Sequence, residues 1–168
     1  MKRIIFITFV FIVLMSVVPA SARVKSFNDA IEDSAEGFFD LAQKVFERYK
    51  QFEEDVSLLA EVIYHENWHT DKDHLAAYYT GAVVMNRVHS DEWPNTIYDV
   101  LYQKGQYSTT KKFYTVELPS ECYDMARDIL INGTPDVPYN VVYQATFKQG
   151  SGLWIPPING EYFCYGEA

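Results

Sequence analysis

The sequence predicts an α+β fold that is mostly helical and ends in a small antiparallel β-sheet. Apolar residues recur at steps of three and four over most of residues 26–132, which is the periodicity of amphipathic helices. Two later runs, residues 141–147 and 162–165, are instead β-branched and aromatic, as expected for strands. The Asn-Gly pair at 159–160 is a turn signal between these runs, so we expect them to form a hairpin. The length of 168 residues allows one domain.

Residues 1–22 have the pattern of a secretory signal peptide. Lys2 and Arg3 precede an apolar run over residues 4–18, and residues 20–22 read Ala-Ser-Ala, a small-x-small cleavage pattern. An uncleaved membrane anchor is the alternative, but the apolar run is shorter than the roughly 20 residues that a spanning helix needs. We therefore expect cleavage after residue 22, export from the cell and no stable membrane insertion afterwards.

The mature chain is expected to begin with an amphipathic helical segment, residues 23–55, in which residues 26–52 form a helix. Gly37 is a candidate interruption of this helix, because glycine has a low helix propensity. The apolar stripe of the segment consists of Phe38, Leu41, Ala42, Val45, Phe46, Tyr49 and Phe52. Such a stripe is typical of a core or docking face rather than of a membrane-active helix.

Two further helices are expected at residues 55–69 and 74–88. The second is nearly all apolar, which is typical of a buried central helix. Asp71 and Asp73 precede it, and either carboxylate can cap its start.

The remaining two helices are bounded by capping residues. Asn95 or Thr96 starts a short helix that runs to Tyr102. The last helix begins near Pro119, which suits a first helical turn, and the Asn-Gly pair at 132–133 ends it. Its apolar face consists of Cys122, Met125, Ala126, Ile129 and Leu130.

Composition narrows the class of function. The 14 basic and 23 acidic residues give a net charge of -9, so we do not expect a nucleic-acid partner. Aromatic residues reach 16%, which indicates either a dense core or a groove that stacks on flat or sugar-like ligands. Cys122 and Cys164 can form a disulfide in an exported protein or remain as small buried side chains, and the sequence leaves both options open.

Glu66 is the first candidate catalytic residue. On a helix over residues 55–69 it shares one face with Leu59, Val62 and Ile63. A carboxyl at the end of an apolar stripe faces the interior or a cleft wall, where burial favours the protonated form that a general acid requires. The alternative is a glutamate at a fraying helix end that points to water.

Residues 65–69 also fit the pattern H-E-x-x-H. In zinc peptidases the two histidines, here His65 and His69, bind the metal, and the glutamate polarises the metal-bound water. Such a site needs a third ligand, and Leu75 stands where the metzincin pattern has its third histidine. We therefore expect no metal and no other cofactor, with the zinc peptidase kept as the alternative.

Several spaced motifs in one order resemble the SleB/CwlJ-type cell wall hydrolase domain, named for enzymes that degrade the spore cortex. The resemblance covers about residues 56 to 166 and includes the expected hairpin. Its motifs are L-L-A-E-V-I-Y-H-E at 58–66, G-A-V-V-M-N-R-V at 81–88, W-P-N-T-I-Y-D-V-L-Y at 93–102 and G-Q-Y-S at 105–108. We therefore expect a cell wall hydrolase catalytic domain over residues 56–168.

The resemblance implies a lysozyme-like fold, a role in germination or wall turnover, and peptidoglycan glycan strands as the substrate. It matches Glu66 to the catalytic glutamate of the family, and many members are lytic transglycosylases, which form a 1,6-anhydro sugar without water. An ordinary hydrolase usually needs a second carboxylate. Sequence alone leaves four candidates for it: Asp71, Asp73, Glu92 and Glu161.

The same resemblance places substrate-binding residues in two segments. Gln106, Tyr107 and Ser108 belong to the G-Q-Y-S loop near the cleft, and Tyr143 and Gln144 on the first strand are expected to line the other wall.

Three further features bear on the site. His65 stands where relatives carry a small residue, and Thr109 replaces a proline often found after the loop at residues 105–108. Arg87 is expected to be buried and paired with a carboxylate. An inactive wall-associated protein of the same fold is a further alternative.

Overall fold

The computed structural model describes residues 20–167, so most of the expected signal peptide lies outside the described residues. The chain forms two compact units, Met1–Lys50 and Gln51–Ala168. Within the described part of the chain, no helix combines the length and the apolar character needed to cross a membrane. The second unit carries helices and a small antiparallel sheet, which confirms the α+β fold class.

Helix α2 runs without a break from Ala20 to Asn67. The prediction of two helices, divided near residues 52–55, was therefore wrong, and Gly37 does not interrupt the helix. One glycine costs a helix about 1 kcal/mol relative to alanine, and no proline follows it to force a stop. Side-chain pairs one turn apart, such as Lys44 with Asp40 at 2.7 Å, add to helix stability on the exposed face.

The core of the second unit forms where the last turns of α2 meet two other helices, α3 (Leu75–Val88) and α5 (Ser120–Asn132). Ile63 of α2 and Ile129 of α5 are almost fully buried there. A Cβ atom built on Gly81 of α3 would lie 2.6 Å from the Cδ1 atom of Ile129. The glycine therefore leaves room for the isoleucine side chain against α3.

The predicted starts of the third and fourth expected helices are confirmed. Both carboxylate oxygens of Asp71 accept backbone N–H groups at the start of α3, from Leu75 at 2.9 Å and from Ala76 at 3.0 Å. Helix α4 (Ile97–Tyr102) follows Thr96, whose hydroxyl accepts the backbone N–H of Asp99 at 3.1 Å. These side chains satisfy N–H groups that a helix start leaves without an internal partner.

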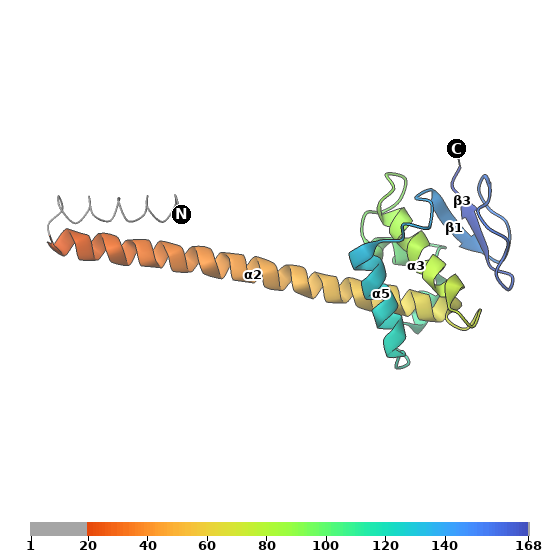
Figure 1. The fold of residues 1–168 in the computed structure, drawn as a ribbon, viewed down its shortest axis with the longest axis horizontal. Helices are drawn as coiled ribbons and strands as arrows, with labels where there is room; N and C mark the ends of the chain where they lie inside the picture. The colour runs from red at the N-terminus through yellow and green to blue at the C-terminus, as the bar shows by residue number, and fades with distance from the viewer. Residues whose placement is uncertain (1–19, 168) are drawn as a thin grey trace. The chain divides into compact units, whose positions relative to one another are not determined.

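The sheet has three antiparallel strands in the order β1-β3-β2, and Figure 1 shows β1 and β3 beside α3. The strands are β1 (Val141–Ala145), β2 (Gly152–Leu153) and β3 (Tyr162–Tyr165). Both long strands were predicted, but β2 is only two residues long and has no readable alternation. The Asn-Gly turn lies directly before β3, on the chain that returns from β2.

Two polar residues at the end of α3 tie the sheet to the helices. The side-chain amide of Asn86 donates to the carbonyl oxygens of Pro138 and Val141, both at 2.9 Å. The Nε atom of Arg87 donates to the carbonyl oxygen of Val142 at 2.7 Å. Among the described residues no carboxylate forms an ion pair with Arg87, so the expected carboxylate partner is replaced by backbone carbonyl and amide oxygens.

Cys122 and Cys164 are both free and buried. Burial raises the pKa of the Cys122 thiol to about 12, with smaller contributions from nearby acidic groups. A thiol that stays protonated in this way is a packing side chain rather than a nucleophile.

Candidate functional site

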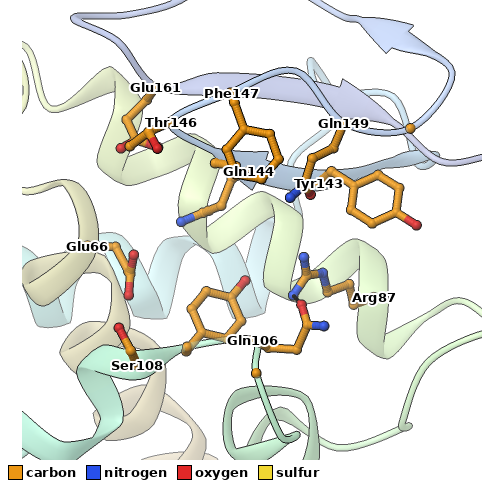
Figure 2. Close-up of a pocket in the computed structure, with 14 residues that line it drawn as sticks. Glu66, Arg87, Gln106, Ser108, Tyr143, Gln144, Thr146, Phe147, Gln149 and Glu161 are labelled. Carbon is orange, nitrogen blue, oxygen red and sulfur yellow. Dashed lines mark hydrogen bonds between the residues drawn. The ribbon is translucent and has the colours of Figure 1, made fainter.

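A cavity of about 820 Å³ lies between the helices and the sheet of the second unit (Figure 2). Its helical wall is formed by Glu66 in the last turn of α2, Arg87 of α3 and the loop at residues 105–108. Its sheet wall is formed by residues 143–150, except Lys148, and by Glu161. Ligand pockets of about 300–1,000 Å³ are common, so this cavity has room for a sugar-sized ligand.

The cavity brings together all six residues that the sequence nominated for catalysis and substrate binding. They come from three separate segments of the chain: Glu66; Gln106, Tyr107 and Ser108; and Tyr143 and Gln144. Figure 2 shows Glu66 and Ser108 on one side of the cavity, while the amide of Gln144 reaches in from the sheet.

The Glu66 carboxyl is half-buried, and a hydroxyl group holds one of its oxygens. The Oγ1 atom of Thr109 donates a hydrogen bond to its Oε1 atom. Thr109 does not line the cavity; it is the second residue of the short 3-10 helix η1 (Ser108–Lys112), which follows the loop. One carboxyl oxygen is therefore fixed from outside the cavity, which limits the rotation of the group.

Glu161 is the second carboxyl of the cavity. Burial raises its pKa above the usual range, and the charge of Glu66 raises it further, while the side-chain amide of Asn67 opposes the shift. Of the four carboxyls that the sequence left open, it alone lines the cavity. Asp71 caps α3, and both Asp73 and Glu92 are exposed outside the cavity.

Arg87 contacts two residues of the loop at 105–108 and the ring of Trp93. Its guanidinium donates from Nη1 to the side-chain oxygen of Gln106 at 3.1 Å, and its Cζ atom lies 4.2 Å from the ring centre of Trp93. The Tyr107 ring centre is 5.3 Å away on the cavity side. A buried cation between two aromatic faces is held by the ring quadrupoles as well as by hydrogen bonds.

Two polar atoms at the cavity have no hydrogen-bond partner among the described residues. They are the hydroxyl oxygen of Tyr107 and the side-chain oxygen of Gln144. Burial raises the pKa of the Tyr107 phenol, so this hydroxyl is neutral and can donate as well as accept. Buried polar groups are usually paired, and these two unpaired atoms lie just behind the cavity surface rather than on it.

The two histidines of the H-E-x-x-H pattern do not share a ligand position in the cavity. The Nε2 atom of His65 lies 3.2 Å from Oε2 of the buried Glu61, and its ring stacks on Phe113. His69 is exposed and lies edge-on to Tyr64. No three His, Cys, Asp or Glu side chains of residues 37–167, the part whose side chains the structure describes, are placed to hold a metal ion.

Sequence reasoning missed most of the segment between β1 and β2. Thr146, Phe147, Gln149 and Gly150 all line the cavity, but this segment has no period that marks which side chains face inward. A Cβ atom on Gly150 would lie 2.0 Å from the carbonyl oxygen of Tyr165, and its φ is 55°. Only glycine fits there without strain, so this residue fixes the path of the cavity wall.

Comparison with protein families finds a match over the middle and C-terminal part of the chain. A family model described as Cell Wall Hydrolase matches residues 71–156. The matched range includes Arg87, the loop at 105–108 and β1, whereas Glu66 and Glu161 lie outside it. No curated protein and no solved structure matches the chain.

Proposed function

The chain belongs to the cell wall hydrolase family, whose function is to degrade peptidoglycan, and we propose that it does so as a lytic transglycosylase with Glu66 as the proton donor. The observation that carries this proposal is the single cavity that holds Glu66 together with both predicted binding segments. The H-E-x-x-H alternative receives no comparable support, because His65 pairs with Glu61 instead of facing the cavity.

The first step of the proposed reaction breaks the bond between the anomeric carbon and the glycosidic oxygen. Protonated Glu66 gives its proton to that oxygen as the bond breaks, and the leaving sugar departs as an alcohol. The Oε1 atom already accepts the Thr109 hydroxyl, so the proton to be delivered belongs on Oε2. Thr109 thus distinguishes the two oxygens of the acid.

The second step closes a ring within the muramic acid residue. Its C6 hydroxyl oxygen bonds to the anomeric carbon, the hydroxyl proton passes to a carboxylate, and a 1,6-anhydro end remains. Glu66, ionised by the first step, is one acceptor for that proton. No water enters the product, so the reaction differs from hydrolysis in the mass of its soluble fragments.

The cavity walls suit a neutral, hydroxyl-rich ligand. Gln106, Ser108 and Gln144 offer hydrogen-bonding groups and Tyr143 offers an aromatic ring, while Tyr107 lines the wall with only 6% of its surface exposed. Sugar rings present hydroxyl groups at their edges and C–H groups on their faces, so polar and aromatic side chains bind them together. We assign these five residues to substrate binding.

We further propose that the protein is exported and acts at the cell wall or on the spore cortex. The support is the charged, apolar and small-x-small pattern of residues 1–22. Sequencing the N-terminus of the protein recovered outside the cell tests this, with Arg23 expected as the first residue. A chain that begins at Met1 contradicts cleavage.

Mass spectrometry of the fragments released from purified peptidoglycan tests the reaction. Anhydro-muramic ends are expected from the wild type, and none from Glu66→Gln. Reducing ends contradict the transglycosylase in favour of a hydrolase. Cleaved stem peptides, lost with a chelator and restored by zinc, support the peptidase instead, and no release from a susceptible wall supports an inactive protein.

A further inference from the structure

The two carboxyls of the cavity stand on opposite walls. Glu66 comes from the end of α2, and Glu161 comes from the turn that leads into β3, on the sheet side (Figure 2). The cavity between them is the one that the substrate is proposed to occupy. Most enzymes that cleave glycosidic bonds use a pair of carboxyl groups, one on each side of the bond.

The turn that carries Glu161 is held firmly in place. Ile158 and Glu161 exchange both backbone hydrogen bonds, at 3.0 and 2.9 Å, across Asn159 and Gly160. Both turn residues have positive φ, 47° and 93°, which matches the twist of a tight hairpin turn. The side-chain amide of Asn159 donates to the carbonyl oxygen of Thr70, just beyond the end of α2. The segment that follows Glu66 therefore anchors the backbone of Glu161.

The environment of Glu161 suits a base. Burial disfavours its negative charge, and the charge of Glu66 disfavours it further, so its pKa is raised. A carboxylate with a raised pKa binds a proton more strongly, and general bases work best when their pKa approaches the operating pH. The Glu66 part of this shift acts only once Glu66 has given up its proton in the first step, because only then do two negative charges repel across the cavity.

We propose that Glu161 is a second catalytic residue, the general base that takes the proton from the hydroxyl group that attacks the anomeric carbon. This inference rests on the proposed function and assigns its second step. Glu66 gives its proton to the leaving oxygen; the attacking oxygen bonds to the anomeric carbon; and its proton passes to Glu161. Protonated Glu161 and ionised Glu66 then exchange one proton through solvent, which restores the starting state.

The attacking hydroxyl has two sources, and the products distinguish them. The C6 hydroxyl of muramic acid leaves an anhydro end, whereas a water molecule leaves a reducing end. Both need the same proton acceptor, so the role of Glu161 does not depend on which one attacks.

The test compares Glu161→Gln and Glu161→Ala with the wild type on purified peptidoglycan. We expect both variants to lose about 10²–10⁴-fold in kcat/KM, the range typical of general-base catalysis. Sodium formate, a small carboxylate, is expected to restore part of the activity of Glu161→Ala in a concentration-dependent way. It is not expected to restore Glu66→Ala, because formate at neutral pH carries no proton to donate. Glu92→Gln, which removes an exposed carboxyl outside the cavity, is the matched control and keeps wild-type activity.

The pH profile gives a second readout. Wild-type activity falls as the pH drops through the raised pKa of Glu161, because a protonated base accepts nothing, and this acidic limb is expected to vanish in Glu161→Gln. Glu161→Gln within threefold of wild type overturns the proposal, and so does a folded Glu161→Ala that formate does not restore. Circular dichroism and thermal unfolding establish that the variants fold. A wild type that releases nothing from the wall refutes the proposed function itself, so this outcome is distinguishable from a failure of the Glu161 assignment alone.

Discussion

The two walls of the cavity are built in different ways. On the helical wall, each reactive or charged group is fixed by a specific bond: Thr109 holds Glu66, and Val142 and Gln106 hold the Arg87 guanidinium. On the sheet wall, residues 146–148 form an exposed connection outside any strand. The helical wall therefore holds the Glu66 carboxyl in one orientation, whereas the exposed part of the sheet wall offers surface for contact with a ligand.

This difference suggests a division of work. Catalysis depends on geometry held within fractions of an ångström, which side chains on rigid helices provide. Binding of a repetitive sugar strand tolerates a more adaptable surface, which connecting segments provide. Changes at Glu66 and at its contact with Thr109 should therefore lower kcat, and changes on the exposed part of the sheet wall should raise KM. Glu161 is the exception on the sheet wall, because its turn is anchored to the segment after α2.

The largest effect is expected at Glu66. Glu66→Gln keeps the size and the Thr109 hydrogen bond but cannot deliver a proton, so kcat should fall about 10⁴-fold with little change in KM. Release of soluble fragments from peptidoglycan, followed over time, measures this. Near wild-type turnover in the folded variant would mean that another residue is the acid, and would contradict the assignment of catalysis to the helical wall.

The second effect concerns the residue that joins the two walls. Arg87→Met removes the hydrogen bonds to Val142 and Gln106 and the contact with the Trp93 ring. Because the carbonyl oxygen of Val142 is buried and loses a charged donor, and the contact with the Trp93 ring is lost as well, the free energy of unfolding should drop by about 2–4 kcal/mol.

Arg127→Met is the matched control for this change. The Arg127 guanidinium pairs with Glu53 near the surface at 2.9 Å, and partly exposed pairs contribute about 0–1 kcal/mol. Chemical denaturation of both variants measures the difference. Equal losses in the two variants contradict the assignment of Arg87 as the link between the walls.

The helical wall was also the more predictable of the two. Glu66 was nominated because an apolar stripe places it on the inner face of its helix and because the family resemblance matches it to the catalytic glutamate, and the loop at 105–108 carries a readable motif. The starts of α3 and α4 followed from the capping residues Asp71 and Thr96, which act locally. Local signals of this kind are present in the sequence itself, since they depend on neighbours three or four positions away.

The sheet wall depends on contacts between distant segments, which periodicity does not reveal. The sequence offered Glu161 only as one of four candidates for a second carboxylate. Its place in the cavity depends on the turn at 159–160, where the side chain of Asn159 bonds to Thr70, a residue far away in the sequence. Strand β2 is too short for alternation, and it exists because it pairs with β3. Periodicity predicts that a helix has an apolar face but not which surface covers that face. Phe38 and Phe46 belong to the predicted apolar stripe, yet they are 68% and 66% exposed.

The third effect tests how firmly the acid must be held. Thr109→Val keeps the shape of the side chain but removes the hydroxyl that bonds to Glu66. We expect kcat to fall about tenfold, equivalent to the roughly 1.5 kcal/mol of a hydrogen bond to a charged group, with KM unchanged. Thr109→Ser retains a hydroxyl and should recover most of the activity. A change in KM alone, or no recovery with serine, assigns Thr109 to packing rather than to orientation of the acid.

The smallest effect is expected at the exposed end of the sheet wall. Phe147 lines the cavity, and its side chain is 61% exposed, so its ring is not needed for the core. Phe147→Ala should leave thermal stability within about 0.5 kcal/mol, as for most surface substitutions. A ring that stacks on a sugar face contributes about 1 kcal/mol, so KM should rise about fivefold while kcat stays constant. Steady-state kinetics on soluble glycan fragments measure both constants. A fall in kcat with KM unchanged shows that this wall, too, fixes the reacting groups, and the distinction between a rigid catalytic wall and an adaptable binding wall is then wrong.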